Sequence, residues 1–220
     1  EKAYDAETDI VRLPVADQQK HGLVVSLSAD DFAVNDTVPY LENRGVKGYF
    51  EARKLPLVVK EVKGKKAFHF EGTQVYTSSF PATLQDNAPY TLEAWVLNDS
   101  ISENECVADF TTSHDELEKI MLVNGTEPRC GVINHYGWYE DAGYKDMKEL
   151  AGKWQHIYIC FDGRMEQVYV NGKLVSEKDI QLLVKPSQFI TLGRNAEGDW
   201  PFTGYLHSLK LWDEYLPLKE

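Results

Sequence analysis

The sequence has few cysteines and no long apolar run. Its 220 residues include only Cys106, Cys130 and Cys160, and none of them forms a Cys-x-x-Cys pair. Structural zinc sites and disulfide frameworks need several closely spaced cysteines, so neither is expected here. We expect three buried free thiols, with one disulfide bond as the alternative. No segment approaches the roughly 20 apolar residues of a membrane-spanning helix, which argues against membrane insertion.

Basic residues are in the minority. The chain has 23 Lys and Arg against 35 Asp and Glu, which gives a formal net charge of -12. Such a surface repels phosphate on average, so nucleic acid and anionic membranes are poor candidate partners. Hydrophobic residues make up 43% and aromatic residues 12%, which is typical of a globular protein and excludes a disordered chain. A chain of this length can bury roughly 70% of its unfolded surface in one domain.

Short apolar runs separated by turn residues indicate an all-β fold. The runs are rich in β-branched and aromatic residues and are bounded by Gly, Asn, Asp and Pro. Asn171-Gly172 predicts a tight hairpin, because a type I′ turn needs positive φ at both central residues. Asn124-Gly125 is expected to open a longer loop back to Cys130. Many short strands at this spacing predict one antiparallel sandwich or barrel over residues 21–220, preceded by a polar arm or linker over residues 1–20.

Five segments in the second half of the chain resemble the laminin-G-like jelly rolls of the concanavalin A-like lectin/glucanase superfamily. They occur in the order of that family and together cover residues 91–212. The segments are TLEAWV (91–96), KWQHIYICFDG (153–163), QVYVNGK (167–173), ITLGRN (190–195), and FTGYL with LKLW (202–206 and 209–212).

The resemblance implies a two-sheet antiparallel jelly-roll β-sandwich of the concanavalin A-like type. In such a fold, Trp95, Trp154 and Trp212 are expected to fill the gap between the sheets. Gly193 and Gly204 are expected at strand ends where the backbone turns tightly.

Some relatives in this superfamily are retaining glucanases, whose E-x-D-x-x-E signature places carboxylates on one face of a strand. The acidic clusters at residues 103–105, 115–118 and 177–179 lack this spacing and are interpreted as solvated surface runs. HExxH, GxSxG, P-loop and GxGxxG motifs are also absent. We therefore expect no enzymatic activity and no cofactor.

Calcium is the metal that this resemblance raises. The family's closing strand usually carries Asp-Glu where this chain has His207-Ser208, which argues against calcium at that position. Asp30, Asp31 and Asp162 offer the oxygen ligands that calcium needs. A turn at Asp162 and a strand-end cap at Asp30 and Asp31 are the simpler interpretation.

Two loop-like windows carry the features of a glycan-binding site, residues 135–144 and 194–202. Sugar recognition combines aromatic faces with carboxylates and amides that bond hydroxyl groups. The alternative is that these aromatic side chains pack over sheet edges, and Phe202 is expected to anchor its loop to the core. The candidate ligand-binding residues are Tyr136, Trp138, Tyr139, Glu140, Asp141, Arg194, Asn195, Asp199 and Trp200.

These observations predict a non-catalytic binding module, with a glycan or polysaccharide as the ligand. The module is expected to belong to a larger secreted or cell-surface protein. A protein-interaction or adhesion module is the first alternative, and a glucanase-type glycoside hydrolase is the second. The hydrolase would require two acids about 5 to 9 Å apart.

Overall fold

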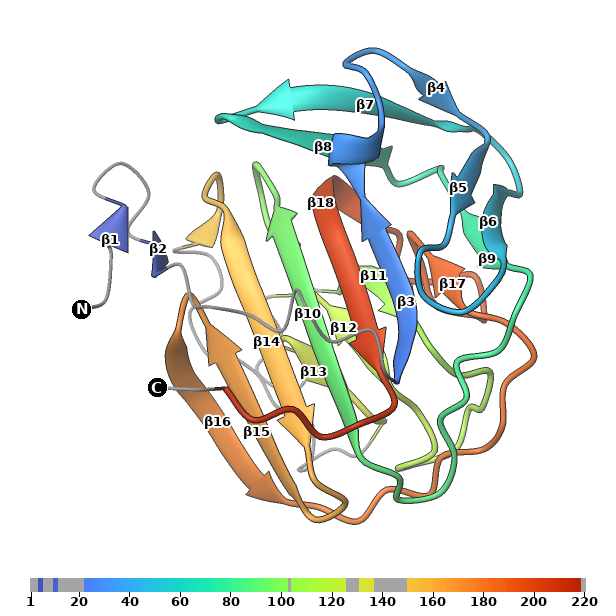
Figure 1. Cartoon of the computed structure of the whole chain (residues 1–220), viewed down its shortest axis with the longest axis vertical. Helices are drawn as coiled ribbons and strands as arrows, with labels where there is room; N and C mark the ends of the chain where they lie inside the picture. Colours follow the sequence, from blue (N-terminus) through green and yellow to red (C-terminus); the bar gives the residue numbers. More distant parts are fainter. Residues whose placement is uncertain are drawn as a thin grey trace.

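The computed structural model describes residues 22–102, 104–125, 131–136 and 150–218, and the backbone of strands β1 (Tyr4–Asp5) and β2 (Ile10–Val11). In these ranges the regular secondary structure is nearly all strand, and η1 (Ala29–Asp31) is a short 3-10 helix. Strands β1 and β2 pair with each other, and the other strands form two antiparallel sheets that lie one behind the other (Figure 1). The predicted all-β jelly-roll sandwich is confirmed, and the boundary at residue 21 stays a prediction.

The larger sheet lies in front in Figure 1 and has nine strands. Strands β3 (Leu23–Ser28) and β8 (Lys65–Glu71) both pair with the long strand β18 (Thr203–Trp212). The order is β16 (Lys173–Asp179), β15 (Met165–Val170), β14 (Gln155–Phe161), β10 (Tyr90–Leu97), β18 (Thr203–Trp212), β8 (Lys65–Glu71), β7 (Leu57–Val62) and β4 (Thr37–Val38), with β3 (Leu23–Ser28) beside β18.

The smaller sheet has seven strands and brings together distant parts of the sequence. Three of the six neighbouring pairs in this sheet, β11 with β17, β17 with β9 and β9 with β6, join strands that are not consecutive in the chain, as the crossovers of a jelly roll require. The order is β13 (Ile133–Asn134), β12 (Met121–Val123), β11 (Cys106–Asp109), β17 (Thr191–Leu192), β9 (Tyr76–Ser78), β6 (Tyr49–Ala52) and β5 (Tyr40–Glu42).

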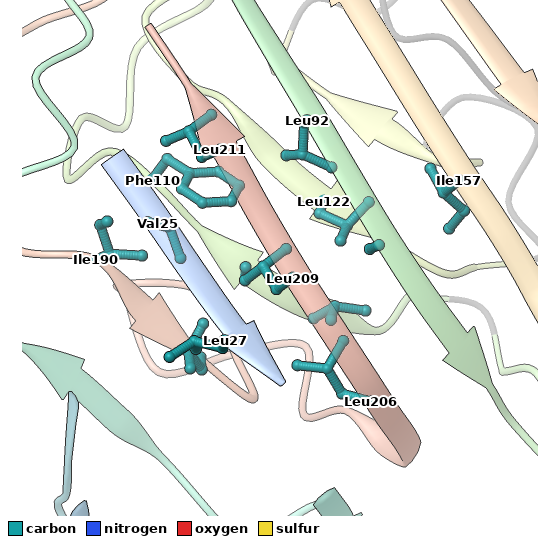
Figure 2. Close-up of a cluster of buried hydrophobic side chains, with 14 of the residues drawn as sticks. Val25, Leu27, Leu92, Phe110, Leu122, Ile157, Ile190, Leu206, Leu209 and Leu211 are labelled. Atoms are coloured by element: carbon teal, nitrogen blue, oxygen red, sulfur yellow. The ribbon is translucent and has the colours of Figure 1, made fainter. Parts of the chain in front are cut away.

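The main core fills the space between the two sheets. Leu92, Leu209 and Leu211 reach into it from the larger sheet, while Phe110 and Leu122 come from the smaller sheet and its connections (Figure 2). All five are fully buried. Alternate residues along each strand therefore supply the core, and the residues between them point to the outer faces.

The prediction that tryptophans fill this gap is wrong. Trp95 lies between Ala94 and Val96, which both belong to the core, so Trp95 points to the outer face of the larger sheet. Trp154 packs with Trp95 in a separate cluster, and Trp212 follows the core residue Leu211. Trp154 and Trp212 are nevertheless buried, so the larger sheet is covered on both faces at these positions.

The hairpin at Asn171-Gly172 is confirmed. It joins β15 to β16 with Val170 opposite Lys173, and both turn residues have positive φ, 51° and 75°. Gly204 is near a strand end as predicted, as the second residue of β18, but it does not lie at a turn. A Cβ there would lie 2.6 Å from the carbonyl oxygen of Leu97, so close backbone approach explains this glycine.

The prediction of buried free thiols is confirmed for the two cysteines that the structure describes. Cys106 and Cys160 are buried and free, and Cys130 lies outside the described residues. Burial raises the pKa of the Cys106 thiol well above its ordinary value, which keeps it protonated and unreactive. Across the described ranges, no helix combines the length and apolar character needed to cross a membrane.

Candidate functional site

The outer face of the smaller sheet carries the candidate site. Ala108 and Leu122 belong to the core, so their strand neighbours Asp109 and Met121 point outward and lie opposite each other in register. Met121 joins Cys106 and Val123 in a small buried apolar cluster on this face. The partly exposed side chains of Tyr136 and Trp200 pack against that cluster.

The two sequence windows meet at this point. Tyr136 comes from the first window, while Asn195 and Trp200 come from the second. The rings of Tyr136 and Trp200 are 6.0 Å apart and nearly perpendicular, and Asn195 Nδ2 lies 3.5 Å from the Tyr136 hydroxyl. The candidate residues Trp138, Tyr139, Glu140 and Asp141 lie outside the described residues.

Arg194 and Asn195 hold the shape of the second loop. The Arg194 guanidinium donates to the carbonyl oxygens of Gly198 and Gly72, at 2.9 and 3.0 Å. Asn195 Oδ1 accepts from the backbone N–H of Asp199 at 2.6 Å. These contacts give Arg194 and Asn195 a positioning role. Of the three residues Arg194, Asn195 and Asp199, only Asp199 is exposed.

The backbone at both aromatic residues has a left-handed conformation. Tyr136 has a φ of 59° and Trp200 a φ of 53°. This conformation is rare for large side chains and costs on the order of 1–3 kcal/mol, and such outliers cluster at functional sites. Tyr136 therefore follows β13 at a bend and does not continue that strand. Phe202 is fully buried against Phe70, which confirms it as the loop's anchor.

A buried lysine lies over the ring of Tyr136. Lys119 has a fully buried side chain, and its Nζ lies 3.0 Å from Asp109 Oδ2 and 2.6 Å from Glu197 Oε1. The ammonium also lies 5.0 Å from the centre of the Tyr136 ring. The hydroxyl of Tyr136 donates to Glu197 Oε2 at 3.2 Å, so one network joins the lysine, both acids and the tyrosine.

The pKa shifts agree with this arrangement. Burial raises the pKa of Asp109 more strongly than the adjacent Lys119 ammonium lowers it. Burial, followed by the negative charge of Glu197, raises the pKa of Tyr136, so its hydroxyl stays a donor. Sequence reasoning missed Lys119, Asp109 and Glu197 because the chain gives no motif for them. The signals are a charged residue directly before the apolar run at residues 120–123, for Lys119, and the position of Glu197 inside the 194–202 window.

The two acids lie close together but do not resemble an open catalytic pair. Both contact the same Lys119 Nζ, so their oxygens are at most about 5.6 Å apart, close to the roughly 5–5.5 Å of retaining glycosidases. However, the ammonium lies between them, and Asp109 is fully buried. The arrangement is better suited to fixing Tyr136 and Glu197 in place than to flanking a sugar.

The remaining acidic residues behave in different ways. Glu105 and Glu118 are buried, so their interpretation as parts of solvated runs is wrong, whereas Glu116 is exposed as expected. Asp162 Oδ1 accepts from the backbone of Arg164 and Met165, which confirms a turn. Within the described ranges, no group of three or more His, Cys, Asp or Glu residues could hold a metal ion.

Gly193 sets the path of the loop that carries Trp200. Its φ is +87°, and a Cβ there would lie 2.3 Å from the carbonyl oxygen of Gln74. Gly193→Ala is expected to lower the free energy of unfolding by about 3 kcal/mol, from the unfavourable φ and the displaced backbone together. Chemical denaturation measures this. Gly64→Ala, with a similar φ but no atom near its Cβ, should cost clearly less.

Comparisons with known proteins agree with this architecture. A family model described as the concanavalin A-like lectin/glucanases superfamily matches residues 70–220. No curated protein gives a match. Domain 4 of AbnA, a GH43 extracellular arabinanase from Geobacillus stearothermophilus solved with arabinotriose, is 18% identical. Its TM-score is 0.62, with 90% of this chain and 96% of that chain covered.

Two further structures show the same fold at low identity. The receptor binding domain of botulinum neurotoxin C/D mosaic serotype is 13% identical, with a TM-score of 0.58 and 90% of this chain covered. A mutant Trypanosoma rangeli sialidase is 16% identical, with a TM-score of 0.56 and 89% of this chain covered. The chain spans 49% and 31% of these two proteins, so the likeness concerns only part of each. The fold therefore occurs in both enzymes and binding domains.

Proposed function

Because the chain belongs to the concanavalin A-like lectin/glucanases superfamily, we propose that it is a non-catalytic module that binds a glycan or polysaccharide. The observation that carries the proposal is the meeting of Tyr136 and Trp200 above a hydrogen-bonded network of Asn195, Glu197 and Lys119. The aromatic faces suit the C–H face of a sugar ring, and Glu197 and Asp199 offer acceptors for its hydroxyl groups.

The fold neighbours support a glycan as the ligand class. Domain 4 of AbnA is described in complex with arabinotriose, and it covers almost the same length of chain as this protein. An arabinofuranosidase with a TM-score of 0.62 is described in complex with arabinofuranosyl-alpha-1,2-xylobiose. We extend this chemistry to the present chain as a proposal, together with an extracytoplasmic location and a place within a larger secreted or cell-surface protein.

A protein-interaction module is the second candidate. Its support is the likeness to toxin receptor-binding domains. Among the described residues, the large hydrophobic side chains that are exposed are Val34, Tyr40, Tyr49, Leu55, Leu174, Leu183 and Tyr215. They come from several different elements, whereas a protein interface more often presents a contiguous apolar patch.

Trp200→Ala is expected to weaken glycan binding by at least about tenfold, because interface aromatics commonly supply more than 1 kcal/mol of binding energy. A glycan array, followed by titration calorimetry with arabinan and xylan oligosaccharides, measures the effect. Trp95→Ala, which removes a partly exposed tryptophan from the outer face of the other sheet, is the matched control and should leave affinity unchanged. Equal losses in both variants would contradict the proposal, as would the absence of any glycan ligand.

A further inference from the structure

A second aromatic group lies on the same outer face, at the opposite side of the smaller sheet. Tyr40 of β5 and Tyr49 of β6 are 55% and 44% exposed. Their ring centres are 5.7 Å apart, with an angle of 77° between the planes. Neither ring is needed to fill the core, so their exposure calls for another explanation.

The register places both rings on the outer face. Leu41 and Phe50 lie opposite each other and are buried in the core. Their neighbours along each strand must therefore point away from the core. Tyr40 lies opposite Glu51, and Tyr49 lies opposite Glu42, so two carboxylates accompany the aromatic pair.

A continuous line of paired residues connects this group with the Trp200 site. Starting from Asp109, the register passes through Thr191, Thr77 and Glu51 to Tyr40. This line crosses four strand-to-strand spacings of about 4.8 Å, so its two ends are roughly 19 Å apart.

The Asp109 end of this line is covered by protein, and the Tyr40 end is exposed to solvent. Asp109 Oδ2 accepts from the backbone N–H of Ala196, in the loop that carries Trp200, and Thr191 is also buried. Thr77 and Glu51 are partly exposed, and Tyr40 is exposed. A ligand on Trp200 would therefore pass from that loop onto the open side chains of β9, β6 and β5.

The polar groups around the tyrosines suit an uncharged polyhydroxyl ligand. Glu42 and Glu51 supply acceptors, and the Tyr40 hydroxyl donates to Glu51 at 3.2 Å. The exposed Arg53 supplies donors and is held by its Nε bond to Thr77 Oγ1, at 2.9 Å. Donors and acceptors are mixed, and the net charge of -12 disfavours an acidic polysaccharide.

We infer that Tyr40 and Tyr49 form a second contact site for an extended, neutral polysaccharide whose other part binds at Tyr136 and Trp200. This inference rests on the proposed function, and it specifies the ligand as a chain of several sugar units. Two contacts on one ligand make the second binding event intramolecular, so affinity increases with ligand length once both sites are reached. Short oligosaccharides reach the Trp200 site alone.

The test uses a ladder of arabinan- and xylan-derived oligosaccharides, from disaccharides to octasaccharides, titrated against the whole chain. For the wild type, affinity should rise at the length that spans both sites. The double variant Tyr40→Ala/Tyr49→Ala should lose about tenfold or more of its affinity for the long members and none for the short ones. Tyr215→Ala removes an exposed tyrosine from the tail after β18 and should bind every member like the wild type.

The outcomes separate this inference from the proposed function. The second site alone is overturned if Trp200→Ala loses binding but the affinity of the wild type does not depend on the length of the oligosaccharide. It is also overturned if Trp200→Ala loses binding but the double variant binds every oligosaccharide like the wild type. A loss in the double variant that is equal for short and long members also overturns it. Absence of binding by every member overturns both proposals. Thermal unfolding of the double variant, which should match that of the wild type, shows that any loss of affinity is not a loss of fold.

Discussion

Replacing Lys119 with methionine is expected to lower the free energy of unfolding by about 3–5 kcal/mol. The ammonium is fully buried and is the shared partner of Asp109 and Glu197, so its removal leaves the buried Asp109 carboxylate without this cation and leaves Glu197 with the exposed His114 beside it. Urea denaturation at neutral pH measures the loss. The matched control is Lys185→Met, which removes an exposed lysine that pairs with Glu118 and should have a much smaller effect.

The loss in Lys119→Met should depend on pH, with a defined sign. Burial already raises the pKa of Asp109 in the native state, and removing the ammonium, which lowers that pKa, raises it further. When the pKa of a carboxyl group is higher in the folded state than in the unfolded state, the protonated form favours folding. This contribution to stability is complete below the unfolded-state pKa of about 3.9 and is lost as the pH rises through the folded-state pKa. The deficit should therefore be largest at neutral pH and shrink on acidification.

A second substitution tests whether the uncompensated charge is the cause. Asp109→Asn in the Lys119→Met background removes the buried carboxylate and should recover a substantial part of the lost stability. The Lys119→Met variant should also bind glycan less tightly than the wild type, because Lys119 holds Glu197 in place and lies over the ring of Tyr136. A deficit that is independent of pH, or a control Lys185→Met that costs as much, would contradict this account.

Local sequence signals predicted the parts of the fold that local chemistry controls. Asn171-Gly172 determines its hairpin because both residues tolerate positive φ. The ordered segments from residue 91 onward predicted the family and the sandwich, and the position of Phe202 in the core followed from them. These features depend on a residue and its neighbours in the chain.

Features that depend on contacts between distant segments were not predictable. Every residue of β14 is buried, so alternation along that strand does not reveal which face points into the main core. The placement of the tryptophans failed for this reason, since the larger sheet is covered on both faces. The Lys119 network joins three separate segments, and the Tyr40 and Tyr49 pair depends on strand register. Both become visible only once the sheet order is known.

Glu105→Ala is expected to cost about 2–3 kcal/mol of unfolding free energy, because it leaves the fully buried Asn98 amide without this partner, at roughly 1–3 kcal/mol, and also removes the acceptor of the partly buried Thr203 backbone N–H. The Glu105 carboxylate is buried and accepts from the Asn98 amide at 2.8 Å and from the Ser102 hydroxyl at 2.8 Å. It also accepts from the backbone N–H and the hydroxyl of Thr203, at 2.8 and 3.0 Å. It therefore joins the end of β10 and the start of β18 to β11.

The same substitution should also disturb the candidate site. Glu105 directly precedes Cys106, whose backbone N–H donates to the carbonyl oxygen of Trp200 at 2.8 Å. Loss of the carboxylate therefore loosens the strand end that holds the Trp200 loop, and glycan affinity should fall together with stability. Glu105→Gln keeps the shape of the side chain but places an amide donor next to other donors. Its stability and glycan affinity should therefore lie between those of the wild type and those of Glu105→Ala. Glu116 is exposed, so Glu116→Ala is the control and should behave like the wild type. An equal loss of stability in Glu105→Ala and Glu116→Ala would show that the buried network does not hold these strand ends together.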